Sequence, residues 1–266
     1  MSTINTNVTS LNAQRNLSAS ALSLTTSMQR LSSGLRVNSA KDDAAGLSIA
    51  ERMNAQTRGM NVAIRNSNDA ISMAQTAEGA LAAISNNLQR MRELAVQGAN
   101  GTNTAADIGS LDAEYALLVA ENTRVIGNTR FNGVNVMGAV SAVFQVGANS
   151  SDTITVTTIA AAQTATTLGS TNALASAQLS VIDTDIGVIT GIRATWGASQ
   201  NRFEAVVANL RVGAENSAAA RGRIMDADYA METSNLSRAQ ILQQAGTAMV
   251  AQANQIPQGV LALLRQ

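Results

Sequence analysis

Apolar residues recur at helical spacing along most of this chain, and a single proline, Pro257, interrupts the pattern. An average composition would give roughly thirteen prolines over the same length. Because proline breaks or kinks a helix, its scarcity permits helices longer than those of most globular domains. The spacing predicts long helices over about 44–97, 105–128 and 173–210, with further helices at the two ends of the chain. We therefore expect a mainly α protein, built as a rod-like bundle of long helices.

A narrow apolar stripe with alternating steps of four and three residues lies near each end of the chain. Such steps place side chains on one face of a helix, as in a coiled coil. The stripes consist of Leu17, Ala21, Leu24, Met28, Leu31 and Leu35 near the start, and of Leu242, Gly246, Met249, Ala253, Ile256, Val260 and Leu263 near the end. Two interpretations remain open. The stripes either belong to separate core helices of one bundle or pair with each other as a coiled coil that joins the ends of the chain.

The period changes from helical to alternating between residues 130 and 158. Asn132-Gly133 is a strong signal for a hairpin turn, and short runs over 142–147 and 153–157 alternate as strands do. We expect a small β element inserted into the helical chain. The Ala/Thr-rich stretch 159–171 after it is typical of a linker or exposed loop.

The composition excludes most enzymatic chemistry. The chain has no cysteine and no histidine, so thiol nucleophiles, Cys/His zinc sites and imidazole bases are all excluded. Three carboxylate pairs lie near predicted helix boundaries, where capping explains them best. They are Asp42 with Asp43, Asp183 with Asp185, and Asp226 with Asp228. We expect no catalytic residue, no cofactor and no metal site.

Charge is low and balanced. Lys plus Arg is 18 and Asp plus Glu is 18, and charged residues make up 14% of the chain, against about 25% in average soluble domains. Neither nucleic acid nor membrane insertion is expected, because no basic cluster and no apolar run of about 20 residues occurs. Without a cleavable leader pattern, these features alone predict a soluble cytosolic protein. So few charges also suggest that partners cover much of the surface.

Several motifs, in order along the chain, resemble those of bacterial flagellins. They occupy residues 31–36, 42–47, 88–97 and 129–133 in the first half, and 226–230, 240–246 and 251–258 near the end. Together they cover roughly the first 150 residues and the last 70. The resemblance implies a short flagellin without large outer domains.

The family resemblance also implies a domain organisation. Residues 1–40 with 230–266 would form a discontinuous inner domain, in which the terminal helices pair as a coiled coil. Residues 44–129 with 173–226 would form a helical rod domain, and residues 130–171 a β-hairpin and linker inserted in it.

By the same resemblance, the protein would be a structural subunit that polymerises into the flagellar filament for swimming motility. The subunit would then be exported unfolded through the flagellar type III machinery and assembled at the filament tip. The resemblance therefore replaces the expectation of a cytosolic protein with that of a secreted, extracellular one. Implied partners are copies of the chain itself, a secretion chaperone on the C-terminal helix, and the filament cap and hook-junction proteins. The terminal stripes would form the polymerisation seam. The alternative is a hook–filament junction protein of the same structural family.

The resemblance finally implies a recognition site. A vertebrate Toll-like receptor senses many flagellins through the first core-helix motif and a glutamate on the next helix. The matching residues here are Gln89, Arg90, Arg92, Leu94, Gln97 and Glu114. From spacing alone, Arg90 and Glu93 are equally well explained as an ion pair on a solvated helix face.

Overall fold

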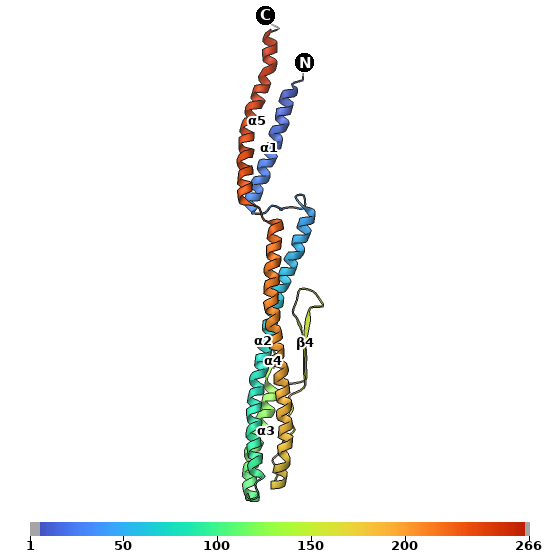
Figure 1. The fold of residues 1–266 in the computed structure, drawn as a ribbon, viewed down its shortest axis with the longest axis vertical. Coiled ribbons are helices and arrows are strands. Elements are labelled where there is room, and N and C mark those ends of the chain that lie inside the picture. Colours follow the sequence, from blue (N-terminus) through green and yellow to red (C-terminus); the bar gives the residue numbers. More distant parts are fainter. Residues whose placement is uncertain (1–5, 264–266) are drawn as a thin grey trace. The chain divides into compact units, whose positions relative to one another are not determined.

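The computed structural model describes residues 6–263 of the backbone and the side chains up to residue 255 (Figure 1). Five helices carry most of the chain: α1 (Val8–Ser33), α2 (Ala44–Gly98), α3 (Ala105–Asn128), α4 (Asn172–Met225) and α5 (Tyr229–Leu263). Four short strands lie between α3 and α4: β1 (Arg130–Phe131), β2 (Val134–Asn135), β3 (Val140–Gln145) and β4 (Thr153–Thr158). The predicted mainly α class with a small β insert is confirmed. Position 257 lies within α5, so its proline does not end the helix.

The chain divides into two compact units. We call residues 1–55 with 216–266 the terminal unit and residues 56–215 the central unit. The boundaries fall inside α2 and α4, whereas the sequence pattern placed them in the breaks between helices. Within the terminal unit, the start of α2 and the end of α4 contact each other, and Arg221 Nη1 donates to Asn54 Oδ1 at 3.0 Å.

In the terminal unit, α1 and α5 lie side by side and run in opposite directions (Figure 1). Asn7 Nδ2 donates to the carbonyl of Ala253 at 2.7 Å at one end of the pair, and Arg30 reaches Glu232 at the other. The structure therefore resolves the alternative left open by the two stripes, since the terminal helices pair with each other. Gly34 ends α1 in the left-handed region, with φ of 70°, and its N–H donates to the Arg30 carbonyl at 2.8 Å.

Two carboxylate pairs confirm the capping prediction. Asp43 Oδ1 accepts from Gly46 N–H at 2.8 Å at the start of α2, and Asp228 Oδ1 accepts from Ala230 N–H at 2.9 Å at the start of α5. Their partners in sequence, Asp42 and Asp226, lie in the connections beside these caps. Asp43 and Asp228 satisfy backbone N–H groups that a helix start leaves unpaired.

The connections between helices of the terminal unit also pair with each other. Arg36 N–H donates to the Met225 carbonyl at 2.6 Å, and Ala227 N–H donates to the Gly34 carbonyl at 2.9 Å. A single antiparallel bridge thus joins Leu35 to Asp226. Leu35, a member of the predicted stripe, therefore lies beyond the end of α1.

The capping prediction is wrong for the third pair, because Asp183 and Asp185 lie inside α4. Asp183 pairs with Arg92 of α2, with 2.7 Å between Nε and Oδ1. Asp185 is buried and binds the backbone of a segment about twenty residues earlier. Neither partner could be recognised from the local sequence.

The central unit has a large continuous core between α2, α3, α4 and the hairpins. Its largest fully buried side chains include Trp196, Phe203 and Leu81. The α3 helix starts with a reciprocal capping box of Thr104 and Asp107.

The β element consists of two hairpins, as the turn signals predicted. Asn132 and Gly133 have φ of 48° and 82°, the conformation that a two-residue hairpin turn requires between β1 and β2. The strands β3 and β4 pair over six residues each, and β4 alternates exposed threonines with buried Ile154, Val156 and Thr158. The Phe144 ring of β3 meets the edge of Phe203 with ring centres 5.3 Å apart, so the hairpin packs into the helical core.

The prediction of a loop over 159–171 is confirmed, and more than half of its residues are exposed, but the loop is not a free linker. This segment, which we call the strap, has no regular secondary structure but buries Ala161, Ala165 and Leu168 to 4% exposure or less. Asp185 accepts hydrogen bonds from the backbone N–H groups of Thr164 and Ala165 at 2.8 and 3.0 Å. A carboxylate thus replaces the strand partner that the strap lacks, and small side chains allow the backbone to approach the helices.

Candidate assembly surface and recognition patch

The contact between α1 and α5 uses only part of the predicted stripes. Leu17, Leu24 and Leu31 are half-buried, as is Ala21. Ser10 is buried one heptad before Leu17, in the same row. The second row that the pairing covers contains Ser20, Ser27 and Gly34 rather than Met28, which is 57% exposed.

On α5, small residues face α1. Ala239, Gly246 and Ala253, seven residues apart, are covered together with Glu232. A Cβ atom added at Gly246 would lie 3.0 Å from Leu17 Cδ1, which shows how closely the helices approach. Leu242 and Met249 do not face α1, since they are 50% and 64% exposed. Ile256, Val260 and Leu263 lie outside the residues whose side chains the structure describes.

Large apolar side chains therefore point away from the helix pair. We call them the outward apolar set: Val8, Leu11, Leu22, Met28, Tyr229, Met231, Ile241, Leu242 and Met249, each between 50% and 71% exposed. Met231, Leu242 and Met249 are eleven and seven residues apart. At about 100° per residue, they fall within roughly 20° of one another around α5. An exposed apolar set of this kind marks a surface that associates with another molecule.

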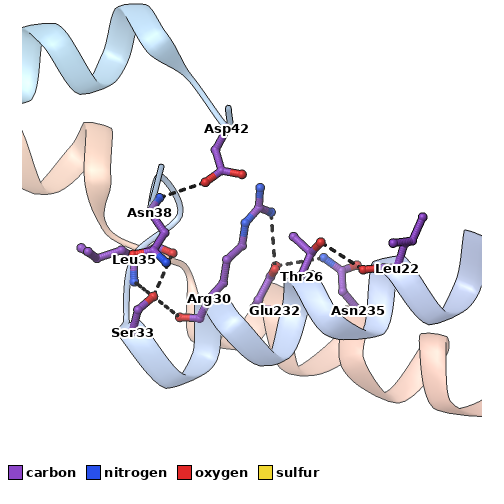
Figure 2. Close-up of polar contacts among 9 residues, drawn as sticks. All are labelled: Leu22, Thr26, Arg30, Ser33, Leu35, Asn38, Asp42, Glu232 and Asn235. Carbon is purple, nitrogen blue, oxygen red and sulfur yellow. Dashed lines mark hydrogen bonds and ion pairs between the residues drawn. The ribbon is translucent and has the colours of Figure 1, made fainter. Parts of the chain in front are cut away.

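Few charges interrupt this surface. Across 7–34 and 229–255, the charged residues are Arg15, Arg30, Glu232 and Arg238. Arg30 and Glu232 form an ion pair with 3.4 Å between Nη1 and Oε1, and the Glu232 side chain is 8% exposed (Figure 2). Asn235 Nδ2 also donates to Glu232 Oε2 at 3.2 Å, so two neighbours partner the nearly buried carboxylate.

The loop after α1 adds a further charge beside this ion pair. Asp42 accepts from the backbone N–H of Asn38 at 3.1 Å (Figure 2). It also accepts from the hydroxyl and the backbone N–H of Ser39 at 3.0 and 2.9 Å. These hydrogen bonds, led by the Ser39 hydroxyl, lower the pKa of the Asp42 carboxyl, and the Arg30 charge adds to the effect. The sequence patterns did not indicate that Arg30 has acidic neighbours from two separate elements.

The recognition candidates lie on the central unit, and the structure brings several of them together. Arg90 Nε lies 2.8 Å from Glu114 Oε1, and Arg90 Nη1 lies 2.9 Å from Glu93 Oε2. The hydrogen bond with Glu114 is the main cause that raises the pKa of Arg90, and it lowers the pKa of Glu114. All three side chains are 46% to 67% exposed, so the pairing holds a guanidinium in place at the surface.

One predicted recognition residue is not available on this surface. Leu94 is 1% exposed and belongs to the core of the central unit, so its side chain is not presented at the surface with the others. Gln89, Arg92 and Gln97 are exposed, and they line a shallow hollow. Glu93, expected only as an ion-pair partner of Arg90, and Val96, which the sequence did not single out, complete its walls. Their spacing along α2 places all five on one helix face, which is the signal that could have found them.

Other kinds of site were also considered. No helix in the described part of the chain is long and apolar enough to cross a bilayer. Among the described residues, no group of three or more acidic side chains is arranged to hold a metal ion.

Comparison with known proteins gives consistent matches. The model of the bacterial flagellin N-terminal helical region matches residues 4–142, and that of the C-terminal helical region matches residues 179–264. A flagellin of Halalkalibacterium halodurans is 45% identical over 98% of this chain and 99% of its own length. The flagellar filament 33 kDa core protein of Treponema phagedenis is 40% identical over 98% of this chain and 99% of its own length. The crystal structure of Bacillus cereus flagellin superposes with a TM-score of 0.51 and 37% identity, over 55% of this chain and 88% of that one.

Proposed function

Since this chain belongs to the bacterial flagellin family, whose members are structural proteins and not enzymes, we propose that it polymerises with copies of itself through the terminal unit. The chain is a structural subunit of a flagellar filament. Copies related by a repeating rotation and translation would contact one another head to tail, and such contacts extend without closing. Swimming motility is the function of the resulting filament.

The outward apolar set is the observation that supports this proposal. Fully burying a Leu, Ile or Met side chain is worth about 1.5–3 kcal/mol, and these residues remain largely exposed in the single chain. Neighbouring copies would cover them. We assign Met28, Leu242 and Met249 of the polymerisation seam to contacts between copies. Leu17, Ala21, Leu24, Leu31 and Ala253 would instead hold α1 against α5.

The alternative, a hook–filament junction protein, is not favoured. Curated relatives that match nearly the full chain at 40–45% identity are named as a flagellin and a filament core protein.

Export and location are inferred from family membership. We infer that the subunit leaves the cell unfolded through the flagellar type III machinery and is assembled at the tip, outside the cell. A chaperone on α5, the filament cap and the hook-junction proteins are the further proposed partners. Such a chaperone would cover the α5 members of the outward apolar set before export.

Receptor recognition is a second proposed role, supported by the exposed ion pair of Arg90 and Glu114. A Toll-like receptor would contact these two residues together with Gln89, Arg92 and Gln97, and not the buried Leu94. We expect Arg90→Ala monomer to activate receptor-bearing reporter cells several-fold less than unchanged monomer. Arg124→Ala is the matched control, because Arg124 forms a similarly exposed ion pair with Glu121 on α3. Equal loss in both variants would contradict the assignment.

The polymerisation proposal is tested by seeded assembly. Leu22→Asp places a carboxylate on a side chain that is 71% exposed in the single chain, so the subunit should fold normally. Its assembly, followed by light scattering and electron microscopy, should nevertheless fall strongly. Leu117→Asp is a matched control, since Leu117 is 73% exposed on α3 of the central unit. Normal filament yield from Leu22→Asp would refute the role of the terminal unit.

A further inference from the structure

The methionines of this chain are distributed unevenly between the two units. Among those whose side chains the structure describes, Met28, Met231 and Met249 are 57%, 63% and 64% exposed, and all three belong to the terminal unit. The three most buried are Met73, Met91 and Met137, at 6%, 0% and 1%, and all belong to the central unit.

Exposure controls the chemistry of a methionine sulfur. A sulfur lone pair attacks one oxygen of a hydroperoxide, the O–O bond breaks, and the oxygen stays on sulfur as a sulfoxide. With hydrogen peroxide, the other oxygen leaves as water, so sulfur loses two electrons and the peroxide gains them. The product is polar and chiral where the thioether was apolar and flexible.

We propose that Met28, Met231 and Met249 are the oxidation sites of the unassembled subunit, and that their sulfoxides block polymerisation. The block rests on the proposed function, because it requires that neighbouring copies cover the outward apolar set. On α5, Met231 and Met249 lie on the same line as Leu242. Two sulfoxides there put strong hydrogen-bond acceptors on an apolar line that contact with another copy would remove from water.

The buried methionines of the central unit should be protected from oxidation. Met91 is fully buried, and its sulfur accepts weak hydrogen bonds from Asn122 Nδ2 and Gln163 Nε2 at 3.7 and 3.6 Å. A peroxide reaches it only when the central unit opens, which is rare for a well-packed core. The modification therefore leaves the fold of the central unit intact and acts on assembly alone.

The experiment exposes full-length monomer to hydrogen peroxide and follows each methionine by peptide mass spectrometry. Met28, Met231 and Met249 should gain oxygen several-fold faster than Met73, Met91 and Met137. Seeded assembly of the oxidised monomer should be several-fold slower than that of untreated monomer. Treatment with methionine sulfoxide reductases should restore the rate, since they reduce both sulfoxide epimers.

Two variants serve as controls. The triple variant Met28→Leu, Met231→Leu and Met249→Leu should assemble with and without peroxide, because leucine is apolar and cannot be oxidised. Met53→Leu, at a half-buried position outside the exposed group, should remain as sensitive as the unchanged chain.

The outcomes separate this inference from the proposed function. Failure of untreated monomer to assemble on seeds refutes polymerisation, while the order of oxidation is still read by mass spectrometry. Assembly at an unchanged rate with all three residues oxidised overturns the block. Equal or faster oxidation of the buried methionines overturns the assignment of the sites.

Discussion

The two units of this protein place their large apolar side chains in opposite ways. The central unit buries Trp196, Phe203 and Leu81 completely in a core shared by three helices and the β3–β4 hairpin. In the terminal unit, α1 and α5 meet through small residues such as Ser27 and Ala239 and through half-buried leucines, while other leucines and the methionines face outward. The terminal pair therefore buries less apolar surface of its own than the central unit does. On the proposed function, contacts with other copies would supply much of its stability.

The largest expected effect concerns amide hydrogen exchange. In the monomer, amides of α1 and α5 should exchange at least about a thousandfold faster than in the filament, because few apolar contacts hold the two helices together. Amides over 70–97 of α2 should be protected in both states. Strong protection of α1 and α5 in the monomer would remove the contrast between the units.

Truncation of equivalent leucines would sharpen the comparison. Leu81→Ala opens a cavity at a fully buried position and should destabilise the central unit by about 2–5 kcal/mol. Leu24→Ala, at a half-buried position of α1, should cost less than about 1.5 kcal/mol. Urea unfolding of monomers, followed by circular dichroism, measures both. Equal costs would mean that the α1–α5 contact is packed as well as the core.

The strap provides a test of a polar contact within the central unit. Asp185→Asn keeps the shape of the side chain but replaces the charged oxygen that accepts from both backbone N–H groups with a neutral, weaker acceptor. We expect a loss of about 1–3 kcal/mol in the free energy of unfolding. Asp183→Asn, two residues away and exposed, is the control and should change stability by less than about 1 kcal/mol. Limited proteolysis should show cleavage within 159–171 in the Asp185 variant alone.

The ion pair of the terminal unit should contribute somewhat less. Arg30→Met leaves the Glu232 carboxylate nearly buried without its cation, and should destabilise the α1–α5 pair by about 1–2 kcal/mol. Adding Glu232→Gln should recover part of that loss, because the neutral amide needs no counter-charge. Exchange rates of α1 amides provide the measurement. A double variant no better than Arg30→Met would show that charge is not the reason.

The smallest expected effect is the response to acid. Hydrogen bonds lower the pKa values of Asp107, Glu114 and Asp183 in the central unit below those of ordinary exposed carboxyls. A carboxyl with a lowered folded-state pKa contributes stability above its unfolded-state value, and this is lost as the pH falls through the folded-state value. Below about pH 4, the central unit should therefore lose stability gradually. The terminal unit, where such hydrogen bonds lower the pKa of the Asp42 carboxyl, should respond less. Unfolding midpoints measured between pH 3 and 6 would show no difference if these hydrogen bonds did not matter.

Much of this organisation was visible in local sequence. Helical spacing predicted the long helices, Asn132-Gly133 predicted the β1–β2 turn, and Asp43 and Asp228 were recognisable as caps. These features depend on residues within a few positions of one another, and hydrogen bonds of that range form in the same way in most contexts. The motifs also predicted the family, which the comparisons confirmed.

Contacts over long sequence distance were not predictable in this way. No local pattern indicates that Asp185 will bind the strap or that Arg92 will pair with Asp183, because each partner is many residues away. The strap was predicted to be exposed since it lacks any periodic signal. The buried part of the strap depends on hydrogen-bond acceptors, such as the Asp185 carboxylate of α4, that the helices supply to its backbone N–H groups.

The sequence by itself determined that apolar residues recur in heptads at both ends of the chain, but it left open whether the two helices pair with each other. Only the tertiary structure decided which side of each helix faces the other. A heptad places two neighbouring lines of side chains near the partner helix. From sequence, the line with the larger side chains is the one expected to face that partner. The closer approach of α1 and α5, seen where Leu17 meets Gly246, instead leaves room for serine, glycine and alanine. Met28, Leu242 and Met249 are therefore displaced to the outside, where another copy of the chain can cover them.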